Sequence, residues 1–289
     1  MNRKVYIRAS SQISVQEPLC EEWMEHPKQL SGPSVRCIDP DYKQFFSPMQ
    51  ARRMGPMFKR AMVTSRKVLE TSGISCPDAI ITGTALGCIG NTESFLDPMC
   101  REGESGLSPT AFMQSTHNTI GSMVAIALGC HGYNCTYSQD GVSFESALLD
   151  AVMQLETGEA GNALVGAHDE ITDNVAHLRD AIEPEGYPFT EGSVAMMLVS
   201  GGRPDDALCE VADVRILSRP ESVEEAVAGY RADYVMRNDV TFSLFGRCGP
   251  ASGLAVHAAA NMIAAGRYSS VLVVNESGSN AGLVFLKKV

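Results

Sequence analysis

The feature that most constrains the fold is a helix followed by a strand, a unit that occurs twice in the chain. In the first copy, apolar residues recur at helical spacing between Phe144 and Leu155 and predict one buried helix face. Gly158 ends this helix, and the apolar run NALVGA at 162–167 follows it. A short apolar run bounded by polar residues is typical of a buried strand that a helix covers.

The second copy lies 108 residues further along the chain. Gly249 stands there in the place of Gly141, ASGLAVHAAANMIAAG forms the second helix, and VLVV at 271–274 matches the first strand. Another apolar stretch follows each copy, at 192–200 and at 281–289, and a helix leading into a strand precedes each copy. Order and spacing repeat without a gap, so the chain is interpreted as an internal duplication.

The duplication predicts an α/β fold of two related halves, packed sheet against sheet through the two central helices. We place the N-terminal half at residues 1–204 and a shortened C-terminal half at residues 205–289. A chain of 289 residues buries roughly 75% of its unfolded surface, which is enough for a substantial core.

The N-termini of the two central helices would converge if a pseudo-twofold axis relates them. Each helix N-terminus has four backbone N–H groups without intrahelical partners and the positive end of the helix dipole. Both features favour a thiolate or an oxyanion at that place. A reactive site is therefore expected within residues 138–143 and 246–250.

Charge and hydropathy exclude several classes of function. The formal net charge of -11, without a basic block, argues against nucleic acid or an anionic membrane as partner. No run approaches the roughly 18 apolar residues of a membrane span, and the opening residues MNRKVYIRAS alternate like a strand rather than a signal peptide. We therefore expect a cytoplasmic protein that does not bind membranes.

Metal and cofactor motifs are not recognisable. The nine cysteines include no C-x-x-C pair, and several lie inside apolar segments, so most are expected to be reduced core residues without a zinc site. The run HDE at 168–170 follows a predicted strand, but three adjacent residues point in different directions and do not favour a metal site. The glycines of GTALGCIGN lack the spacing of a dinucleotide-binding loop.

Six segments in order carry a resemblance to a known family: SPMQARRMGPMFKRAMVTSRKVLETSG, IITGTALG, SPTAFMQSTHNTIGSMVAIALGCHGYNCT, EGSVAMMLVS, GRCGPASG and NESGSNAGLVF. With these segments the sequence resembles the β-ketoacyl-[acyl-carrier-protein] synthases of the thiolase fold over most of its length. The resemblance implies a thiolase-like layered αβαβα fold whose second half is shortened.

The family's condensing chemistry needs a cysteine nucleophile and two histidines. The matching positions here are Gly141 for the cysteine, Asn238 for the first histidine and Arg247 for the second. Asparagine supplies no proton at neutral pH and arginine stays charged, so these positions offer neither a nucleophile nor a titrating base. Only eight residues separate Asn238 from Arg247, where the family usually has a long stretch.

Residues near the nucleophile position remain alternatives. A register slip of two residues would place the nucleophile on Gln139 or Ser143, and a slip of three on Ser138, but none is cysteine. Ser143 is more typical of a helix N-cap. Cys135 lies six residues too early, within a predicted strand, and is interpreted as a buried structural thiol.

Histidines could supply a base for such a nucleophile. His117 and His131 flank the same region, although a histidine that hydrogen bonds to a backbone carbonyl near the core is the plainer interpretation. His257 lies within the second apolar helix and is expected to be packed there.

Three functions follow from the resemblance. The first is a chain length factor, the non-catalytic partner that forms a heterodimer with a synthase and lines a tunnel limiting the growing chain in type II polyketide, aryl polyene or flexirubin-like pathways. GYNCTYS at 132–138 would then be the interface strand, with Phe112, Met113 and Met123 near the tunnel. The second is a divergent acyltransferase or hydrolase with a serine or Cys135 as nucleophile, and the third an active synthase that uses Cys135.

The resemblance also implies partners: a catalytic ketoacyl synthase, or a second copy in a homodimer, and an acyl carrier protein. Carrier proteins are acidic, so an acidic chain such as this one would need a local basic patch to bind one. The candidate residues for that patch, whose plainer interpretation is one solvated helix face, are Arg52, Arg53, Lys59, Arg60 and Arg66.

Overall fold

The computed structural model describes residues 3–182, 186–201, 206–218 and 222–289. Its strands are β1 Val5–Ile13, β2 Ser34–Val35, β3 Ala79–Gly83, β4 Tyr133–Tyr137, β5 Asn162–Asp169, β6 Phe189–Thr190, β7 Gly192–Ser200, β8 Cys209–Ser218, β9 Tyr234–Met236, β10 Ser270–Ser277 and β11 Asn280–Lys287. Its α-helices are α1 Pro48–Ala51, α2 Pro56–Ser72, α3 Ile89–Glu102, α4 Pro109–Met113, α5 Thr119–Leu128, α6 Ser143–Thr157, α7 Asp173–Ile182, α8 Val223–Ala228, α9 Asn238–Phe245 and α10 Ala251–Ala264. Three short 3-10 helices are η1 Glu22–Met24, η2 Tyr42–Gln44 and η3 Asp140–Val142.

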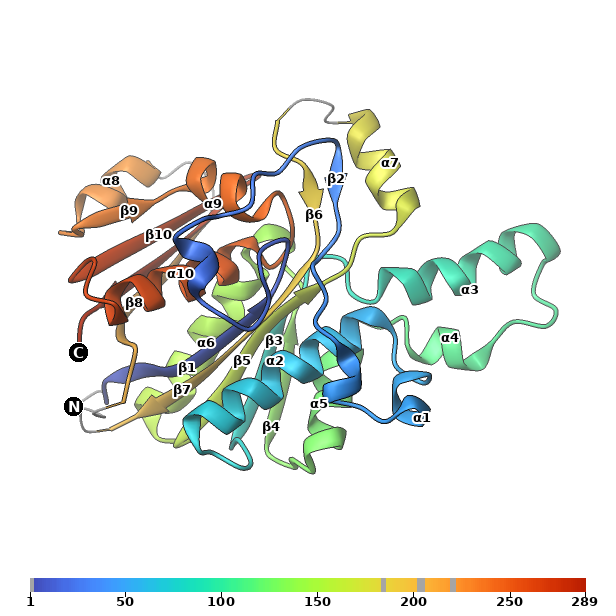
Figure 1. Cartoon of the computed structure of the whole chain (residues 1–289), viewed down its shortest axis with the longest axis horizontal. Helices are drawn as coiled ribbons and strands as arrows, with labels where there is room; N and C mark the ends of the chain where they lie inside the picture. Colours follow the sequence, from blue (N-terminus) through green and yellow to red (C-terminus); the bar gives the residue numbers. More distant parts are fainter. Residues whose placement is uncertain (1–2, 183–185, 202–205, 219–221) are drawn as a thin grey trace.

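The N-terminal half contributes five strands to the main sheet, in the order β4-β3-β5-β7-β1. β4, β3 and β5 are parallel, while β7 runs antiparallel to both β5 and β1. Helices α2 and α5 cover the outer face of these strands (Figure 1). Helix α2 begins with Pro56 at its first position and ends at Gly73, whose φ of 67° is the left-handed conformation that closes a helix.

The C-terminal half contributes four strands, in the order β8-β11-β10-β9. β9 pairs parallel with β10, and β11 pairs antiparallel with β10 and β8. A short antiparallel pairing of β1 residues 5–7 with β8 residues 209–211 joins the two halves into one nine-stranded sheet. Helix α8 covers the outer face of this half through Val223, Ala226 and Val227.

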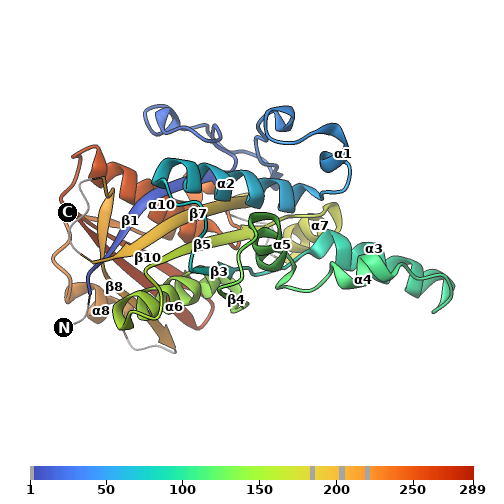
Figure 2. The ribbon, with the colours of Figure 1, turned by 90° about the horizontal axis from the view of Figure 1, so that it is seen from below.

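The two central helices lie between the half-sheets. Helix α6 contacts β3 and β5 of the first half and β8 and β11 of the second, and α10 contacts β10 and β11 as well as β7 and β1. The layers are therefore helix, sheet, helices, sheet, helix, as predicted from the duplication (Figures 1 and 2). The layered α/β fold with a shorter second half is confirmed, with the addition that the half-sheets are hydrogen bonded through β1 and β8.

The repeat unit itself is confirmed by the element boundaries. Helix α6 begins at Ser143 and α10 at Ala251, while β5 spans 162–169 and β10 spans 270–277, so both elements keep the 108-residue shift. The predicted boundary between the halves, at 204 and 205, lies outside the described residues and stays a prediction.

The main core forms where the central helices face both sheets. Phe144 and Leu148 of α6, Leu254 of α10 and Val273 of β10 are almost fully buried in one apolar cluster. Truncating such a leucine to alanine costs about 2–5 kcal/mol. The core therefore holds the heads of α6 and α10 rigidly against each other.

An arm that the sequence did not predict projects from this body. Helices α3 and α4 lie between β3 and α5 and extend away from the sheets in both views (Figures 1 and 2). None of the side chains of α3 and α4 is buried. None of the described helices is long and apolar enough to cross a membrane.

Candidate functional site

The heads of α6 and α10 meet at a cavity of about 370 Å³, as the duplication predicted. Its wall takes backbone and side chains from both halves. The lining residues used below are Asp140, Gly141, Asp169, Arg247, Cys248, Gly249, Ser252, Asn275 and Ser277. The wall formed by the described residues includes no histidine.

Gly141 occupies the predicted nucleophile position at the head of α6, within η3. A Cβ added there would lie 2.3 Å from Oγ and 2.6 Å from Cβ of Ser277. Ser277 at the end of β10 therefore fills the space in which a side chain on residue 141 would begin. The Asn275 Nδ2 donates to the Gly141 carbonyl at 2.7 Å, which holds this backbone in place.

Ser143 is buried and fully engaged by backbone groups. Its Oγ accepts from the Gln139 N–H at 2.8 Å and contacts the carbonyl oxygens of Asp140 at 2.6 Å and Thr84 at 3.0 Å. The prediction that Ser143 is the N-cap is wrong, because the cap position is Val142 and Ser143 is the first residue of α6. The hydroxyl instead ties the turn before α6 to the end of β3.

The other candidates near the helix head lie outside the cavity wall. Ser138 and Gln139 are exposed between β4 and η3, and the Gln139 side-chain oxygen accepts a hydrogen bond from Ser146. Cys135 is half-buried in β4, the strand at the sheet edge, so the expectation of a fully buried thiol is wrong.

Asn238 and Arg247, which the resemblance matched to the two histidines, differ in their surroundings. Asn238 begins α9, and its side chain donates to the Glu276 carbonyl at 2.7 Å and accepts from the Glu276 N–H at 3.2 Å. It thereby joins α9 to the end of β10 outside the cavity wall. Arg247 lines the cavity, donates from Nε to the Tyr187 carbonyl at 2.7 Å and lies 3.9 Å from the centre of the Phe189 ring.

None of the histidines considered in the sequence lies on the described cavity wall, where a base would be needed. His117 and His131 are both exposed, so the expectation that they are satisfied near the core is wrong. His168 is buried with Nδ1 2.7 Å from Ser193 Oγ, and burial lowers its pKa to about 3. His257 is packed in α10 as predicted, with Nε2 3.1 Å from a carboxylate oxygen of Glu21.

Asp169, at the end of β5, shapes the cavity floor. It accepts hydrogen bonds from Thr84 Oγ1 at 2.6 Å and from the backbone N–H groups of Ala85 and Leu86 at 2.8 Å each. Burial raises its pKa to about 6, although these hydrogen bonds favour the ionised form. A Cβ at Gly249 would lie 1.9 Å from Asp169 Oδ2, so only glycine lets the head of α10 approach this carboxylate.

Glu145 is a buried carboxyl behind the cavity that the sequence did not single out. Its Oε1 accepts from Asn275 Nδ2 at 2.8 Å, and burial raises its pKa to about 7 against the opposing effect of this bond. Ser252, on the cavity wall, also lowers the pKa of Glu145. Within the described residues, however, neither Ser252 Oγ nor Glu145 Oε2 has a hydrogen bond of standard geometry. The signal available in the sequence was a glutamate in the first turn of α6.

Cys248 is the thiol of the described cavity wall. It lies within the stretch 246–250 where the sequence predicted a site, but the sequence did not single it out. Burial raises its pKa to about 12, so the thiol form prevails at neutral pH. A thiolate is the nucleophilic form of cysteine. Cys248 therefore lies in the cavity without the environment that activates a cysteine, and the described residues contain no cluster of three potential metal ligands near it or elsewhere.

The match to a family decides the identity. The family model of the β-ketoacyl synthase N-terminal domain matches residues 21–230. The chain belongs to the β-ketoacyl synthase family. No curated protein matches it.

Three solved structures of β-ketoacyl synthase systems show the same fold. A type II PKS acyl-carrier protein complex with its ketosynthase bound to the hexaketide (AntDE:AntF) is similar with a TM-score of 0.82, 12% identity and 100% of both chains covered. The ishigamide ketosynthase/chain length factor has a TM-score of 0.81, 15% identity and 99% of both chains covered. A ketosynthase (ApeO) in complex with its chain length factor (ApeC) from Xenorhabdus doucetiae has a TM-score of 0.66, 17% identity and 99% of both chains covered. The thiolase-like ketosynthase fold is thus confirmed.

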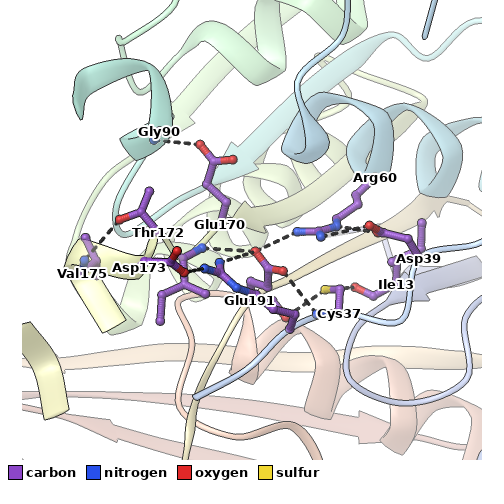
Figure 3. Close-up of polar contacts among 12 residues, drawn as sticks. Ile13, Cys37, Asp39, Arg60, Gly90, Glu170, Thr172, Asp173, Val175 and Glu191 are labelled. Atoms are coloured by element: carbon purple, nitrogen blue, oxygen red, sulfur yellow. Dashed lines mark hydrogen bonds and ion pairs between the residues drawn. The ribbon is translucent and has the colours of Figure 1, made fainter. Parts of the chain in front are cut away.

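An ion-pair network supports this β-ketoacyl synthase fold beside the cavity (Figure 3). Arg60 of α2 is buried and bonds to Asp39 from Nε at 2.7 Å, and its Nη1 lies 2.9 Å from Glu191 Oε2. Glu191 also accepts from the backbone N–H groups of Cys37 and Ile171 at 3.2 Å. Arg60 therefore does not belong to a solvated basic face.

Proposed function

We propose that the chain is a non-catalytic subunit of the chain length factor type, which pairs with a catalytic β-ketoacyl synthase. The observation that carries the proposal is Gly141 at the head of α6, with Ser277 in the space of the missing side chain. A preserved helix head without its nucleophile keeps the shape of a synthase and loses the acyl-enzyme step.

Two other potential nucleophiles, Ser143 at the start of α6 and Cys248 on the cavity wall, also argue against catalysis. Ser143 is held by three backbone groups, and Cys248 is protonated at neutral pH. The partners of Ser143 in the described residues include no histidine, and the described cavity wall around Cys248 includes none either. A serine or cysteine nucleophile requires such a base or a lowered pKa, which Ser143 and Cys248 lack. Cys135, the nucleophile of the active-synthase alternative, lies outside the cavity wall.

The partner's place in this proposal is the sheet edge formed by β4. Among the described residues this strand pairs only with β3, so its other side offers an edge that could continue a sheet into a second chain. Large apolar side chains are exposed nearby: Ile126 of α5 is 80% exposed and Tyr133 of β4 is 43% exposed. Helix α5 packs against β4, so both side chains belong to one side of the molecule.

The arm extends the apolar surface available to a partner. Phe112 and Met113 of α4 are 58% and 72% exposed. A contiguous patch of exposed apolar side chains is typical of a surface that binds another protein. We propose that the arm and the β4 edge together contact the synthase, with a homodimer through the same edge as the alternative.

A second cavity supplies a place for a growing chain. It measures about 350 Å³, and Met57, Phe58, Ile120 and Met123 form apolar parts of its wall, whereas Phe112 and Met113 lie outside it. Such a cavity at the base of the arm fits the role of limiting the length of an apolar acyl or polyene chain. Replacing Met123, at its wall, by tryptophan would shorten the partner's product.

Two further proposals concern the surroundings of the complex. The acyl carrier protein is acidic, and Arg52 and Arg53 are exposed at the end of α1, where they offer it a small basic surface.

We place the complex in the cytoplasm, the compartment in which the nine free cysteines would normally stay reduced.

Intact-protein mass spectrometry after incubation with an acyl-carrier thioester tests the proposal. The chain is incubated alone and then with the synthase encoded beside it, and with that synthase lacking its own cysteine as control. We expect an acyl adduct on the active synthase alone and elution of the two chains as a 1:1 complex. An adduct on this chain, mapped to Cys248, Ser252 or Ser277, would make it an enzyme and overturn the proposal.

A further inference from the structure

Two cysteines far apart in sequence touch each other on the side of the sheet where β3 and β4 begin. Cys76 lies in the loop between α2 and β3, and Cys130 in the loop between α5 and β4. Their Sγ atoms are 2.9 Å apart across 54 residues of sequence. Among the nine cysteines, all of them in the described part of the chain, this is the only pair with sulfur atoms in direct contact.

We propose that Cys76 and Cys130 form a reversible disulfide when the chain meets hydrogen peroxide, and that this bond closes the base of the segment that carries the arm. The proposal is independent of the proposed function, because it concerns only this chain.

The backbone holds the two cysteines in position. Ala79 and Tyr133 are partners in the β3–β4 ladder, and the Tyr133 N–H donates to the Asp78 carbonyl at 3.2 Å. A Cβ at Gly132 would lie 2.0 Å from that same carbonyl oxygen, so the two loops are pressed together. The sulfur atoms need to approach by less than about 1 Å to reach the disulfide length of about 2.05 Å.

The two thiols differ in access. Cys76 is exposed, whereas Cys130 is 9% exposed. Burial, together with the hydrogen bond with Cys76, raises the pKa of Cys130 to about 12. Cys76 is therefore the sulfur that an oxidant reaches first, and Cys130 is the one that resolves the oxidised product.

The chemistry balances with one peroxide molecule. The Cys76 thiolate attacks one oxygen of hydrogen peroxide, the O–O bond breaks, and the products are a sulfenic acid on Cys76 and one water after protonation. The Cys130 sulfur then attacks the Cys76 sulfur, the S–O bond breaks, and the hydroxide leaves as a second water with the proton of Cys130. The two thiols are oxidised and the peroxide is reduced.

The bond would close a segment that includes β3, the α3–α4 arm and α5. Closing a long loop reduces the freedom of the unfolded chain, so the oxidised form is expected to unfold at higher urea concentration than the reduced form. The effect would be reversed by dithiothreitol.

Cys100 provides a matched control. Cys100 lies on the arm and is exposed, as Cys76 is, but among the described residues no other cysteine sulfur contacts it. Cys100→Ser should leave the oxidation of the 76–130 pair unchanged, whereas Cys76→Ser should abolish it. Cys76→Ser replaces an exposed residue, and its unfolding midpoint should match that of the reduced wild type.

Non-reducing peptide mapping and intact mass, measured on the full chain after a hydrogen peroxide titration, test the proposal. We expect loss of two hydrogen atoms and one cross-linked pair of peptides that contain Cys76 and Cys130, present in wild type and Cys100→Ser only. Addition of oxygen to Cys76 without a cross-link would overturn it, as would an unchanged cross-linked fraction in Cys76→Ser.

Discussion

A Cβ on Gly141 would lie 2.6 Å from the Cβ of Ser277, a separation that no pair of real side chains tolerates. Rotation about χ1 moves the Ser277 hydroxyl away but leaves its Cβ in place. The glycine at residue 141 and the position of β10 are thus one structural fact, because the end of β10 lies against the head of α6.

This relationship predicts that the chain does not accommodate a cysteine at residue 141 unless Ser277 is also changed. Gly141→Cys should destabilise the chain by about 1–3 kcal/mol through overpacking. Adding Ser277→Gly should recover most of that loss and expose the new thiol to iodoacetamide, whereas Ser277→Ala should recover little because it keeps the Cβ. Urea unfolding and alkylation rates of the three variants measure this, and equal midpoints for the Ala and Gly pairs would contradict it.

The proposed interface predicts that one charge on α5 separates the two chains. Ile126→Asp should weaken binding to the synthase at least about tenfold, because a buried unpaired carboxylate costs more than 1.4 kcal/mol. Ile182 at the end of α7 is 67% exposed against 80% for Ile126, so Ile182→Asp is the matched control. Binding measured by titration calorimetry should be normal for the control. Equal affinities for both variants would exclude α5 from the interface.

Glu145 predicts a loss of stability as pH rises. Its pKa is about 7 in the folded chain against an ordinary value of 4.5, so the folded state binds the proton more tightly than the unfolded state. The stabilisation is complete below about pH 4.5 and is lost as pH rises through 7, a change of about 3 kcal/mol.

Glu145→Gln isolates this contribution, since the amide oxygen still accepts from Asn275. The variant should gain stability relative to wild type between pH 5 and pH 8, as measured by urea unfolding at both values. Asp169, whose pKa is also raised, changes the pH dependence of stability in the same direction, and His168, whose pKa is lowered, changes it in the opposite direction. Both residues are present in the wild type and in Glu145→Gln, so their effects cancel in the comparison. A difference that does not change with pH would show that Glu145 stays ionised.

The buried Arg60 predicts a large and correctable loss of stability. Arg60→Met removes the cation 2.9 Å from the buried Glu191 carboxylate and should cost about 3–5 kcal/mol. The double variant with Glu191→Gln should recover part of that cost, because the uncompensated charge is gone. Arg101 pairs with Asp97 at 3.5 Å on the exposed arm, and Arg101→Met should stay within about 1 kcal/mol of wild type. Equal losses at both arginines in thermal or urea unfolding would refute a buried network.

The sequence by itself determined the repeat and therefore the layers of the fold. Helical spacing from Phe144 to Leu155 and the same order 108 residues later required two buried helices between two sheets, because an apolar helix face has to be covered. The match of residue 141 to the nucleophile position of the family stays a prediction of the same kind, since it rests on counting back from Gly158 along the helix.

Only the tertiary structure decided what stands around that position. Ser277 beside Gly141, Asn275 on Glu145 and Asp169 against Gly249 join residues more than 75 positions apart, and no local pattern encodes such contacts. The sequence could not show which charged residues are buried, because Arg60 and Lys59 are neighbours on one helix. Only the packing of Glu191 against α2 buries Arg60. Local periodicity specifies elements and their faces, whereas burial and partners depend on which distant strand ends at the same place.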